Sequence, residues 1–191
     1  MYGFNQETKL NERASFAPGI SSNVELVSVK FDFPRKDGTG DKALLFDFKG
    51  PNGERHRHVE FPIGDKAADP VKSAESLGKR VKHIVTKFIP EEEAILTGNT
   101  FEEFCNGTIA LLEGKTAGKK VCIKLLYDKK DNLAFTRYIG FIAKNAHDLS
   151  ISTAESPFLK KQNATPTSTD VLEEGIVEEQ GTNGAVDDLP F

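Results

Sequence analysis

The chain has 191 residues, 38% of them hydrophobic and 28% charged, which suits one ordinary domain with additional segments better than two full domains. Its two cysteines, Cys105 and Cys122, are too few and too far apart for a disulfide framework, and no Cys/His spacing predicts structural zinc. No run approaches the roughly 18 apolar residues of a membrane span and no leader is evident, so we expect a soluble cytoplasmic protein.

The formal charge is distributed unequally. Residues 170–191 contain seven acidic side chains and no Lys or Arg, so this segment carries −7. Because the whole chain carries −4 at pH 7, residues 1–169 carry +3. We therefore expect a mildly basic body followed by a strongly acidic tail.

The N-terminal part predicts an arm followed by three antiparallel strands. Residues 1–22 are polar and close with a Pro-Gly pair, which indicates an arm. Residues 23–33 alternate between apolar and polar side chains, as in a strand with one buried face. The expected buried positions are Val27, Val29, Phe31 and Phe33. A second alternating run covers 43–49, and the turn signal at 50–53 folds it back on a third strand at 54–63.

The middle of the chain changes to helical periodicity. Two runs of apolar residues at helical spacing lie within about 71–114, separated by a proline and an acidic stretch. Alternation returns at 120–127, and the polar turn at 128–132 leads into a last strand through Phe135 and Phe141.

The composition changes again after about residue 148. Residues 149–184 mix Ser, Thr, Pro, Gly, Asn and Glu without sustained periodicity. Ordering a residue costs about 1–2 kcal/mol, and this segment has too few apolar side chains to offset that cost. We expect a disordered linker that leads to an acidic tip at residues 185–191.

The order of these elements resembles the OB fold, a five-stranded Greek-key barrel that binds oligonucleotides or oligosaccharides. The expected fold class is therefore mainly β with a helical insertion (α+β), a barrel at residues 23–148 and a disordered acidic C-terminal tail. The chain closes with five residues that add to this resemblance. They are Asp187, Asp188, Leu189, Pro190 and Phe191.

The body, linker and tip together resemble the single-stranded DNA-binding proteins of bacteria and their phages, whose acidic tails commonly end in Asp-Asp-aliphatic-Pro-Phe. The resemblance implies a divergent member of bacterial or phage origin that covers unpaired DNA in replication, recombination or repair. From the residues themselves we expect no cofactor, no metal and no catalytic activity. The resemblance leaves open whether the chain acts alone or as a homo-oligomer.

The tip suits capture by a partner protein. The ring of Phe191, its proline neighbour and the free α-carboxylate fit a small apolar pocket flanked by Arg or Lys. Asp187 and Asp188 would steer the tip toward basic rims. The expected partners are a polymerase, helicase or nuclease; the alternative is a tail that only confers solubility.

Two loops are candidates for contacts with single-stranded DNA, because OB folds hold their ligands with the loops after strands one and four. The basic residues of these loops are Arg35, Lys36 and Lys42 in 34–42, and Lys129 and Lys130 in 128–132. Such side chains follow a phosphate backbone by charge. Each loop also contains two Asp, so ordinary solvated loops remain the alternative.

The third strand places two arginines and two histidines on opposite faces. Arg55 and Arg57 share one face, and His56 and His58 share the other, so one pair faces solvent or ligand. Both residue types can serve a nucleic-acid groove. A metal site at the histidines lacks a third ligand nearby, and a charged strand edge is the ordinary alternative.

Aromatic rings are the second requirement for sequence-tolerant binding, since bases stack on them. The candidates on strands are Phe46, Phe48, Phe61, Tyr127, Phe135 and Tyr138, with core packing as the alternative. Tyr138 is the preferred platform because its neighbours Thr136 and Gly140 leave room for a base. Arg137 and an outward Lys124 are expected to contact phosphate.

No catalytic arrangement is evident. The stretch Leu-Glu-Gly-Lys-Thr-Ala-Gly-Lys-Lys at 112–120 lacks the spacing and the following helix of a phosphate-binding loop. The alternative function is a protein-interaction adaptor, with an OB-like barrel that binds protein or oligosaccharide instead of DNA.

Overall fold

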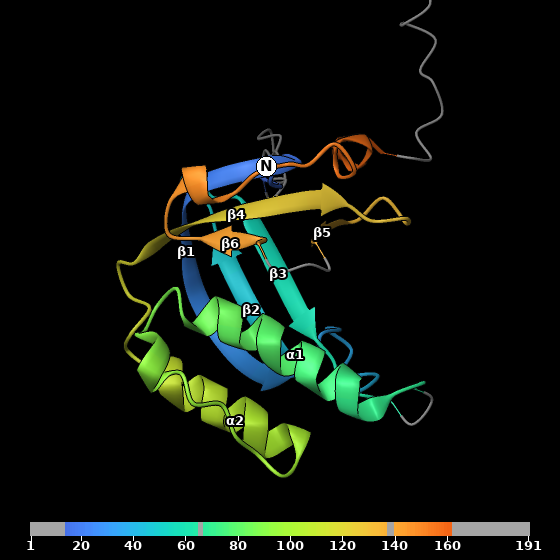
Figure 1. The fold of residues 1–191 in the computed structure, drawn as a ribbon, viewed down its shortest axis with the longest axis vertical. Helices are drawn as coiled ribbons and strands as arrows, with labels where there is room; N and C mark the ends of the chain where they lie inside the picture. Colours follow the sequence, from blue (N-terminus) through green and yellow to red (C-terminus); the bar gives the residue numbers. More distant parts are fainter. Residues whose placement is uncertain (1–13, 65–66, 137–139, 162–191) are drawn as a thin grey trace, which may run out of the picture.

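The computed structural model describes residues 14–64, 67–136 and 140–161, which form a six-stranded antiparallel sheet and two α-helices (Figure 1). The strands are β1 (Gly19–Asp32), β2 (Ala43–Lys49), β3 (Arg55–Glu60), β4 (Lys120–Tyr127), β5 (Leu133–Phe135) and β6 (Ile142–Ala143). The α-helices are α1 (Pro70–Val85) and α2 (Phe101–Leu112), and the short 3-10 helices are η1 (Glu91–Glu93), η2 (Ala146–Asp148) and η3 (Ser156–Leu159). The predicted β fold with a helical insertion is confirmed.

The sheet has the strand order β3-β2-β1-β4-β5, and β6 pairs with β4. β1 joins the two halves because its first part, from Gly19 to Glu25, pairs with β4 and its second part, from Glu25 to Asp32, pairs with β2. The predicted meander of β1, β2 and β3 is confirmed by the antiparallel ladders between them.

β1 contains an irregularity that its alternating pattern did not reveal. The pairing with β2 shifts register between Leu26 and Ser28. Leu26 is 3% exposed, whereas Val27, predicted to be buried, is 44% exposed. A bulge places an extra residue in one strand and redirects the side chains around it. The prediction for Val27 was therefore wrong, while Val29 and Phe31 pack against the core beyond the bulge.

The core lies between one face of the sheet and α1. The alternation of β2 is confirmed, since Phe46 and Phe48 are fully buried. α1 contributes buried side chains from one stripe of the helix, and these are Leu77, Val81, Ile84 and Val85. The helix begins where Asp69 accepts a hydrogen bond from Lys72 N at 3.0 Å and Pro70 occupies its first turn.

α2 packs beside β1. Thr100 caps its start by accepting a hydrogen bond from Glu103 N at 3.1 Å, while the Glu103 carboxylate accepts one from Asn99 N. The Phe101 ring meets Phe31 of β1 edge-on at 5.9 Å between centroids. No helix in the described ranges combines the length and the apolar character needed to cross a membrane.

The two margins of the sheet, β3 and β5, are connected by side chains. Phe135 of β5 lies 5.1 Å from the His56 ring, 4.8 Å from the His58 ring and 5.4 Å from the Phe48 ring, centroid to centroid. Backbone pairing between β3 and β5 is absent from the described residues, so the sheet is open there. At this opening the ring of Phe135 covers the core by packing on His56 and His58, whereas a closed barrel would have backbone hydrogen bonds between β3 and β5.

The ordered body extends further at both ends than the composition predicted. Phe16, assigned to the N-terminal arm, is 5% exposed. At the other end, the first part of the predicted linker packs on β4 and β1: Leu149 is 6% exposed, and η3 brings Leu159 to about 4.0 Å from the position of a Cβ on Gly19. Residues 149–161 therefore belong to the body, which corrects the predicted boundary.

Candidate nucleic-acid interface

A basic concave surface lies at the start of β3. It is a hollow of about 640 Å³ between the β2–β3 hairpin and the β1–β2 loop. We call it the β3 hollow, and its lining residues are Lys36, Asp47, Phe48, Gly53, Arg55, His56 and Arg57. Three cationic residues predicted to contact DNA, from two separate segments, thus meet at one surface.

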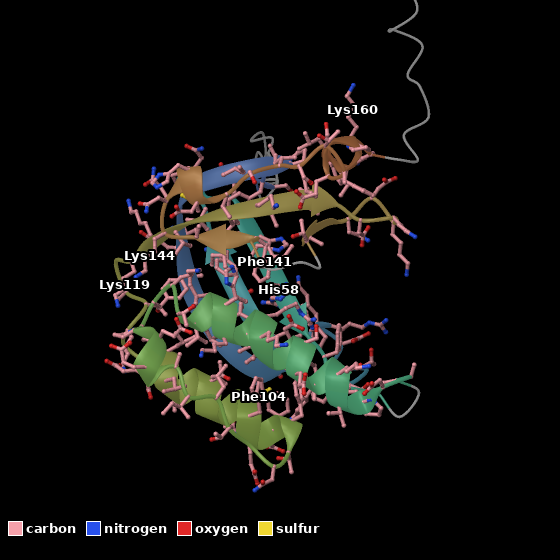
Figure 2. All side chains as sticks on the ribbon, in the orientation of Figure 1. His58, Phe104, Lys119, Phe141, Lys144 and Lys160 are labelled. Carbon is pink, nitrogen blue, oxygen red and sulfur yellow. The ribbon has the colours of Figure 1, made fainter. Side chains whose placement is uncertain are left out.

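β3 presents its arginines outward and its histidines inward. Arg55 and Arg57 are exposed, whereas His56 and His58 are half-buried against Phe135. Figure 2 shows His58 on the side of the sheet that faces α1 and Phe141, whose ring centroid lies 6.0 Å from that of His58. The sequence left both orientations open, and the aromatic contacts of the core distinguish them.

Arg57 is held in a two-point contact with a carboxylate of the neighbouring strand. Its Nε donates to Asp47 Oδ1 at 2.6 Å and its Nη2 donates to Asp47 Oδ2 at 3.2 Å. The hydrogen bond to Asp47 raises the pKa of the Arg57 guanidinium, so this group stays charged. Ser28 also donates to Asp47, at 3.2 Å. The charge of Arg57 is therefore partly neutralised within the protein.

The other cations of this surface have no such neutralising partner. Among the described residues, no carboxylate lies within ion-pair distance of Lys36, Lys49 or Arg55. Lys49 is exposed and lies opposite Arg55 in the β2–β3 ladder. The sequence analysis missed Lys49. Alternation along β2 could have revealed it, because Lys49 falls on the strand face opposite to that of Phe46 and Phe48.

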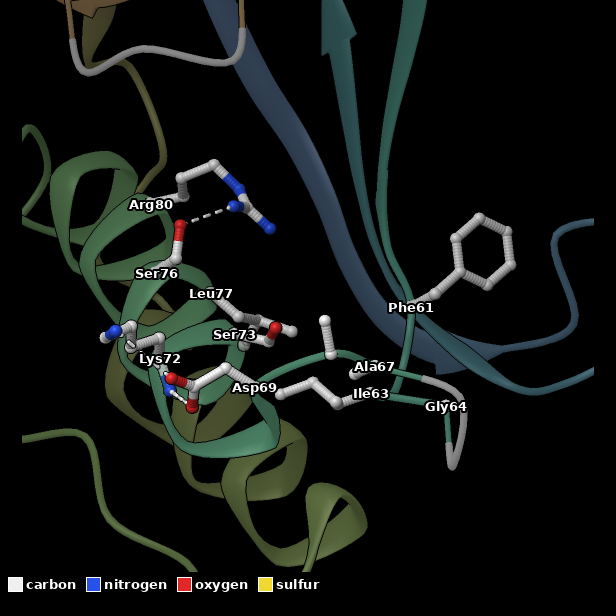
Figure 3. Close-up of a pocket in the computed structure, with 11 residues that line it drawn as sticks. Phe61, Ile63, Gly64, Ala67, Asp69, Lys72, Ser73, Ser76, Leu77 and Arg80 are labelled. Atoms are coloured by element: carbon white, nitrogen blue, oxygen red, sulfur yellow. Dashed lines mark hydrogen bonds and ion pairs between the residues drawn. The ribbon is translucent and has the colours of Figure 1, made fainter.

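An exposed aromatic ring lies just after the row of arginines. β3 ends at Glu60, and the next residue, Phe61, also lines a pocket beside α1. Phe61 is 52% exposed, and Figure 3 shows its ring pointing away from α1. We call Lys49, Arg55, Arg57 and Phe61 the arginine face. Of the other rings proposed for stacking, Phe46, Phe48 and Phe135 are core residues, and Tyr127 is half-buried.

His56 lies at the boundary between the β3 hollow and the core. Its Nε2 is buried and has no hydrogen-bond partner among the described residues. Burial, together with the charge of His58, lowers the pKa of His56 to about 4. The ring is therefore neutral near pH 7 and supplies a flat apolar surface at the edge of the hollow.

The remaining loop cations lie outside the β3 hollow. Arg35 is exposed, and its carbonyl accepts a hydrogen bond from Gly38 N within the loop. The Lys42 ammonium lies 5.6 Å from the Phe31 ring centroid and 5.7 Å from that of Phe33. Lys42 thus contacts two rings of β1 and its extension.

The β4–β5 turn carries a second basic cluster. Asp128 organises the turn by accepting hydrogen bonds from Lys130 N at 2.8 Å and Asn132 N at 2.9 Å. Lys129 and Lys130 are exposed there. Lys161, assigned to the linker in the sequence analysis, lies nearby with its ammonium 5.9 Å from the Tyr127 ring centroid. Its neighbour Lys160 points into solvent (Figure 2).

Lys124 is not the outward phosphate contact that the strand pattern predicted. It is 6% exposed, and its ammonium donates to Glu155 Oε1 at 2.8 Å and to the Ser150 carbonyl at 2.9 Å. The segment at 149–159 covers this face of β4, which is why alternation along β4 gave the wrong orientation. Lys124 holds that segment in place.

The other predicted site residues lie outside the described part of the chain. These are Arg137, Tyr138, Asp187, Asp188, Leu189, Pro190 and Phe191.

A second concave surface lies between α1 and the segment that follows β3. This pocket of about 580 Å³ has a mixed polar and apolar lining, and Figure 3 shows Ile63 and Ala67 on the loop side and Leu77 on the helix side. Arg80 and Lys72 line it as well. Both cations are in ion pairs, Arg80 with Glu60 at 2.6 Å and Lys72 with Asp69 at 3.3 Å. The sequence analysis did not identify this pocket.

Comparison of the chain with protein-family models, curated protein sequences and solved structures finds no match. The functional argument therefore depends on the residues and their geometry.

Proposed function

We propose that this protein binds single-stranded DNA without strong sequence preference and acts in replication, recombination or repair. The observation that carries the proposal is the convergence of Lys36, Arg55 and Arg57 on the β3 hollow. Lys49, opposite Arg55, adds one more cation to this surface, and the 52% exposed ring of Phe61 follows the end of β3 and lines the neighbouring pocket beside α1. Cations that follow phosphates and rings that stack on bases are the two components of sequence-tolerant binding.

The fold supports the same proposal. The strand order β3-β2-β1-β4-β5 becomes a five-stranded barrel if β5 is brought onto β3, and the contacts of Phe135 with His56 and His58 already join these two margins. We interpret the fold as an OB-type barrel with a long helical insertion. In such barrels the β2–β3 surface and the adjoining loops bind oligonucleotides.

The C-terminal tip is proposed to recruit partner proteins. Residues 170–191 carry −7 and end in Asp-Asp-Leu-Pro-Phe, the pattern that resembles the tails of bacterial and phage single-stranded DNA-binding proteins. An apolar ring close to two aspartate carboxylates fits an apolar pocket with a basic rim on a polymerase, helicase or nuclease. The acidic tail repels DNA phosphates and is not part of the DNA-binding surface.

The proposal is tested by titrating a fluorescent oligo-dT with the full chain across a salt series and measuring anisotropy. Three to five phosphate contacts predict a slope of log K against log salt of about −2 to −3.5. The same titration on residues 1–169 should give equal or higher affinity, because the change removes seven negative charges. Salt-independent binding, or none at low salt, would contradict the proposal.

Replacing Asp47 with Asn should strengthen DNA binding. The change keeps the side-chain size, removes a negative charge from the β3 hollow and frees Arg57 to contact phosphate. We expect about threefold to tenfold higher affinity at fixed salt, and a salt slope steeper by about 0.7 if one phosphate contact is gained. Stability should change by less than about 1 kcal/mol, because the ion pair is partly exposed. An unchanged or weaker affinity would show that Arg57 does not face the ligand.

The alternative, a protein-interaction adaptor, is favoured by the pocket beside α1. Ile63, Ala67 and Leu77 offer a surface for an apolar side chain, and Lys72 lies at its border. A chain that ignores oligo-dT would make this pocket the leading candidate site.

A further inference from the structure

The segment that follows η2 crosses β4 and carries lysines at its far end (Figure 1). We call residues 149–161 the β4 strap. At its start, Leu149 is buried in a small apolar cluster with Cys122 of β4. At its end, the Lys161 ammonium lies 5.9 Å from the ring centroid of Tyr127, the last residue of β4. The strap therefore follows β4 from near its start to its end.

A buried ion pair fixes the middle of the β4 strap. The buried Lys124 ammonium donates to Glu155 Oε1 at 2.8 Å and to the Ser150 carbonyl at 2.9 Å. Glu155 Oε2 accepts hydrogen bonds from Ser152 N at 2.9 Å and Ser152 Oγ at 3.0 Å. Burial raises the pKa of Glu155, but the hydrogen bonds from Lys124 and Ser152 outweigh it and keep the pKa below its ordinary value. A buried ammonium that loses its carboxylate is costly, so this pair determines where the strap lies.

The end of the β4 strap adds cations to those of the β4–β5 turn. Lys160 and Lys161 are exposed, as are Lys129 and Lys130 of the turn. In the part of the chain that the structure describes, none of these four lysines takes part in an ion pair. Exposed ammonium groups from two segments that are far apart in sequence thus gather at one end of β4.

β5 connects the β4–β5 turn to the β3 hollow. The Phe135 ring of β5 lies 5.1 Å from the His56 ring, centroid to centroid, and His56 lines the hollow. Phe135 follows Lys130 by five residues. At about 3.3 Å per residue this is at most roughly 17 Å of chain. An OB-type barrel contacts about 4–16 nucleotides, so one strand in the hollow can also reach the turn and the strap.

We propose that the β4 strap forms a second contact surface for single-stranded DNA, where Lys160 and Lys161 join Lys129 and Lys130 in binding phosphates. Exposed ammonium groups without carboxylate partners suit the backbone of any sequence. The inference rests on the proposed function, because it extends the path of the same ligand beyond the β3 hollow. Lys124 and Glu155 act as positioning residues that hold the strap without contacting the ligand.

Replacing Lys160 and Lys161 with Gln tests the second surface in the full chain. Lys79→Gln with Lys144→Gln is the matched control, since both lysines are exposed and Figure 2 shows Lys144 on the opposite side of the molecule from Lys160. The probe is a fluorescent oligo-dT of about 20 nucleotides, titrated by anisotropy across a salt series. Loss of two phosphate contacts should make the slope of log K against log salt shallower by about 1.4, while the control keeps the wild-type slope.

The outcomes separate this inference from the proposed function. Equal slopes in the two variants, with Lys49→Glu and Arg55→Glu together still weakening binding, would overturn the second surface and leave the β3 hollow as the site. Wild-type protein that does not bind oligo-dT at low salt would overturn the proposed function, and the second surface with it.

Glu155→Gln tests the positioning by the ion pair, because two effects of this change have opposite signs. Loss of a negative charge alone would strengthen DNA binding, whereas release of the β4 strap from Lys124 would weaken it. We expect binding weaker by about twofold to threefold and a shallower salt slope. Glu102→Gln removes the same charge at an exposed position of α2 and should not weaken binding. Stronger binding by Glu155→Gln would overturn the positioning role of the pair.

Discussion

Replacing Glu60 with Gln should lower the free energy of unfolding by about 2–3 kcal/mol. Glu60 is 4% exposed, and its carboxylate accepts two hydrogen bonds from Arg80, at 2.8 and 2.6 Å. His58 Nε2 lies 3.0 Å from the same carboxylate. Gln keeps the shape but loses the charge, so the Arg80 guanidinium would lie beside an amide. The effect falls below that of a fully buried pair because the Arg80 side chain is 27% exposed.

The measurement is urea unfolding followed by circular dichroism, since the chain has no Trp. Glu93→Gln is the matched control, because Glu93 pairs with Lys115 at 3.1 Å and both side chains are about half exposed. It should change the free energy of unfolding by less than about 1 kcal/mol. Equal losses in the two variants would contradict a structural role for the Glu60–Arg80 pair.

Lowering the pH from 6.5 toward 4 should destabilise the fold, and His56→Phe should remove much of that dependence. Burial, with the charge of His58, lowers the pKa of His56 to about 4, whereas an unfolded histidine titrates near 6.5. Between these values the unfolded chain binds more protons, so the free energy of unfolding falls as pH falls. The contribution of this one group is about 2–3 kcal/mol across the window.

Phe suits this position because the buried Nε2 of His56 has no partner in the described part of the chain and the ring packs against Phe135. Burial and the charge of Lys87 also lower the pKa of His83, so the variant keeps a smaller slope of the same sign. Burial raises the pKa of Glu60, but the bonds to Arg80 and His58 outweigh it and hold it below 4.5, so Glu60 acts at lower pH.

The measurement is the free energy of unfolding in urea at intervals between pH 7.5 and 4.5. His147→Phe serves as the control because that side chain is 79% exposed and its Nε2 lies 3.2 Å from the half-exposed Asp148 carboxylate. A wild-type slope that persists undiminished in His56→Phe would contradict the burial argument.

The local patterns of the sequence predicted the strands and helices themselves well. Alternation in β2 placed Leu44, Phe46 and Phe48 on one buried face but did not reveal that Ala43 and Leu45 are buried as well, and helical spacing located both helices. The prediction that Val27 is buried was wrong because strict alternation cannot detect the bulge between Leu26 and Ser28 in β1. The prediction that Lys124 points into solvent was wrong because residues 149–159, which follow β4 in sequence, cover the second face of that strand.

The candidate site shows the same division between local and tertiary information. Opposite faces for the arginines and histidines of β3 follow from alternation alone. Which pair faces outward depends on Phe135, which is 77 or more residues away in sequence and packs on the rings of both histidines. The position of Lys36 next to Arg55 and Arg57 depends on the path of the β1–β2 loop, which no periodic pattern encodes.

The most direct test of the DNA-binding surface reverses charge at matched positions and measures oligo-dT affinity at low salt. Lys49→Glu with Arg55→Glu alters the arginine face, while Lys79→Glu with Lys144→Glu makes the same change in net charge at exposed residues outside the β3 hollow. We predict that the first pair of substitutions weakens binding at least about tenfold more than the second. Equal losses in the two variants would show that binding follows net charge, and would contradict a DNA-binding site at the arginine face.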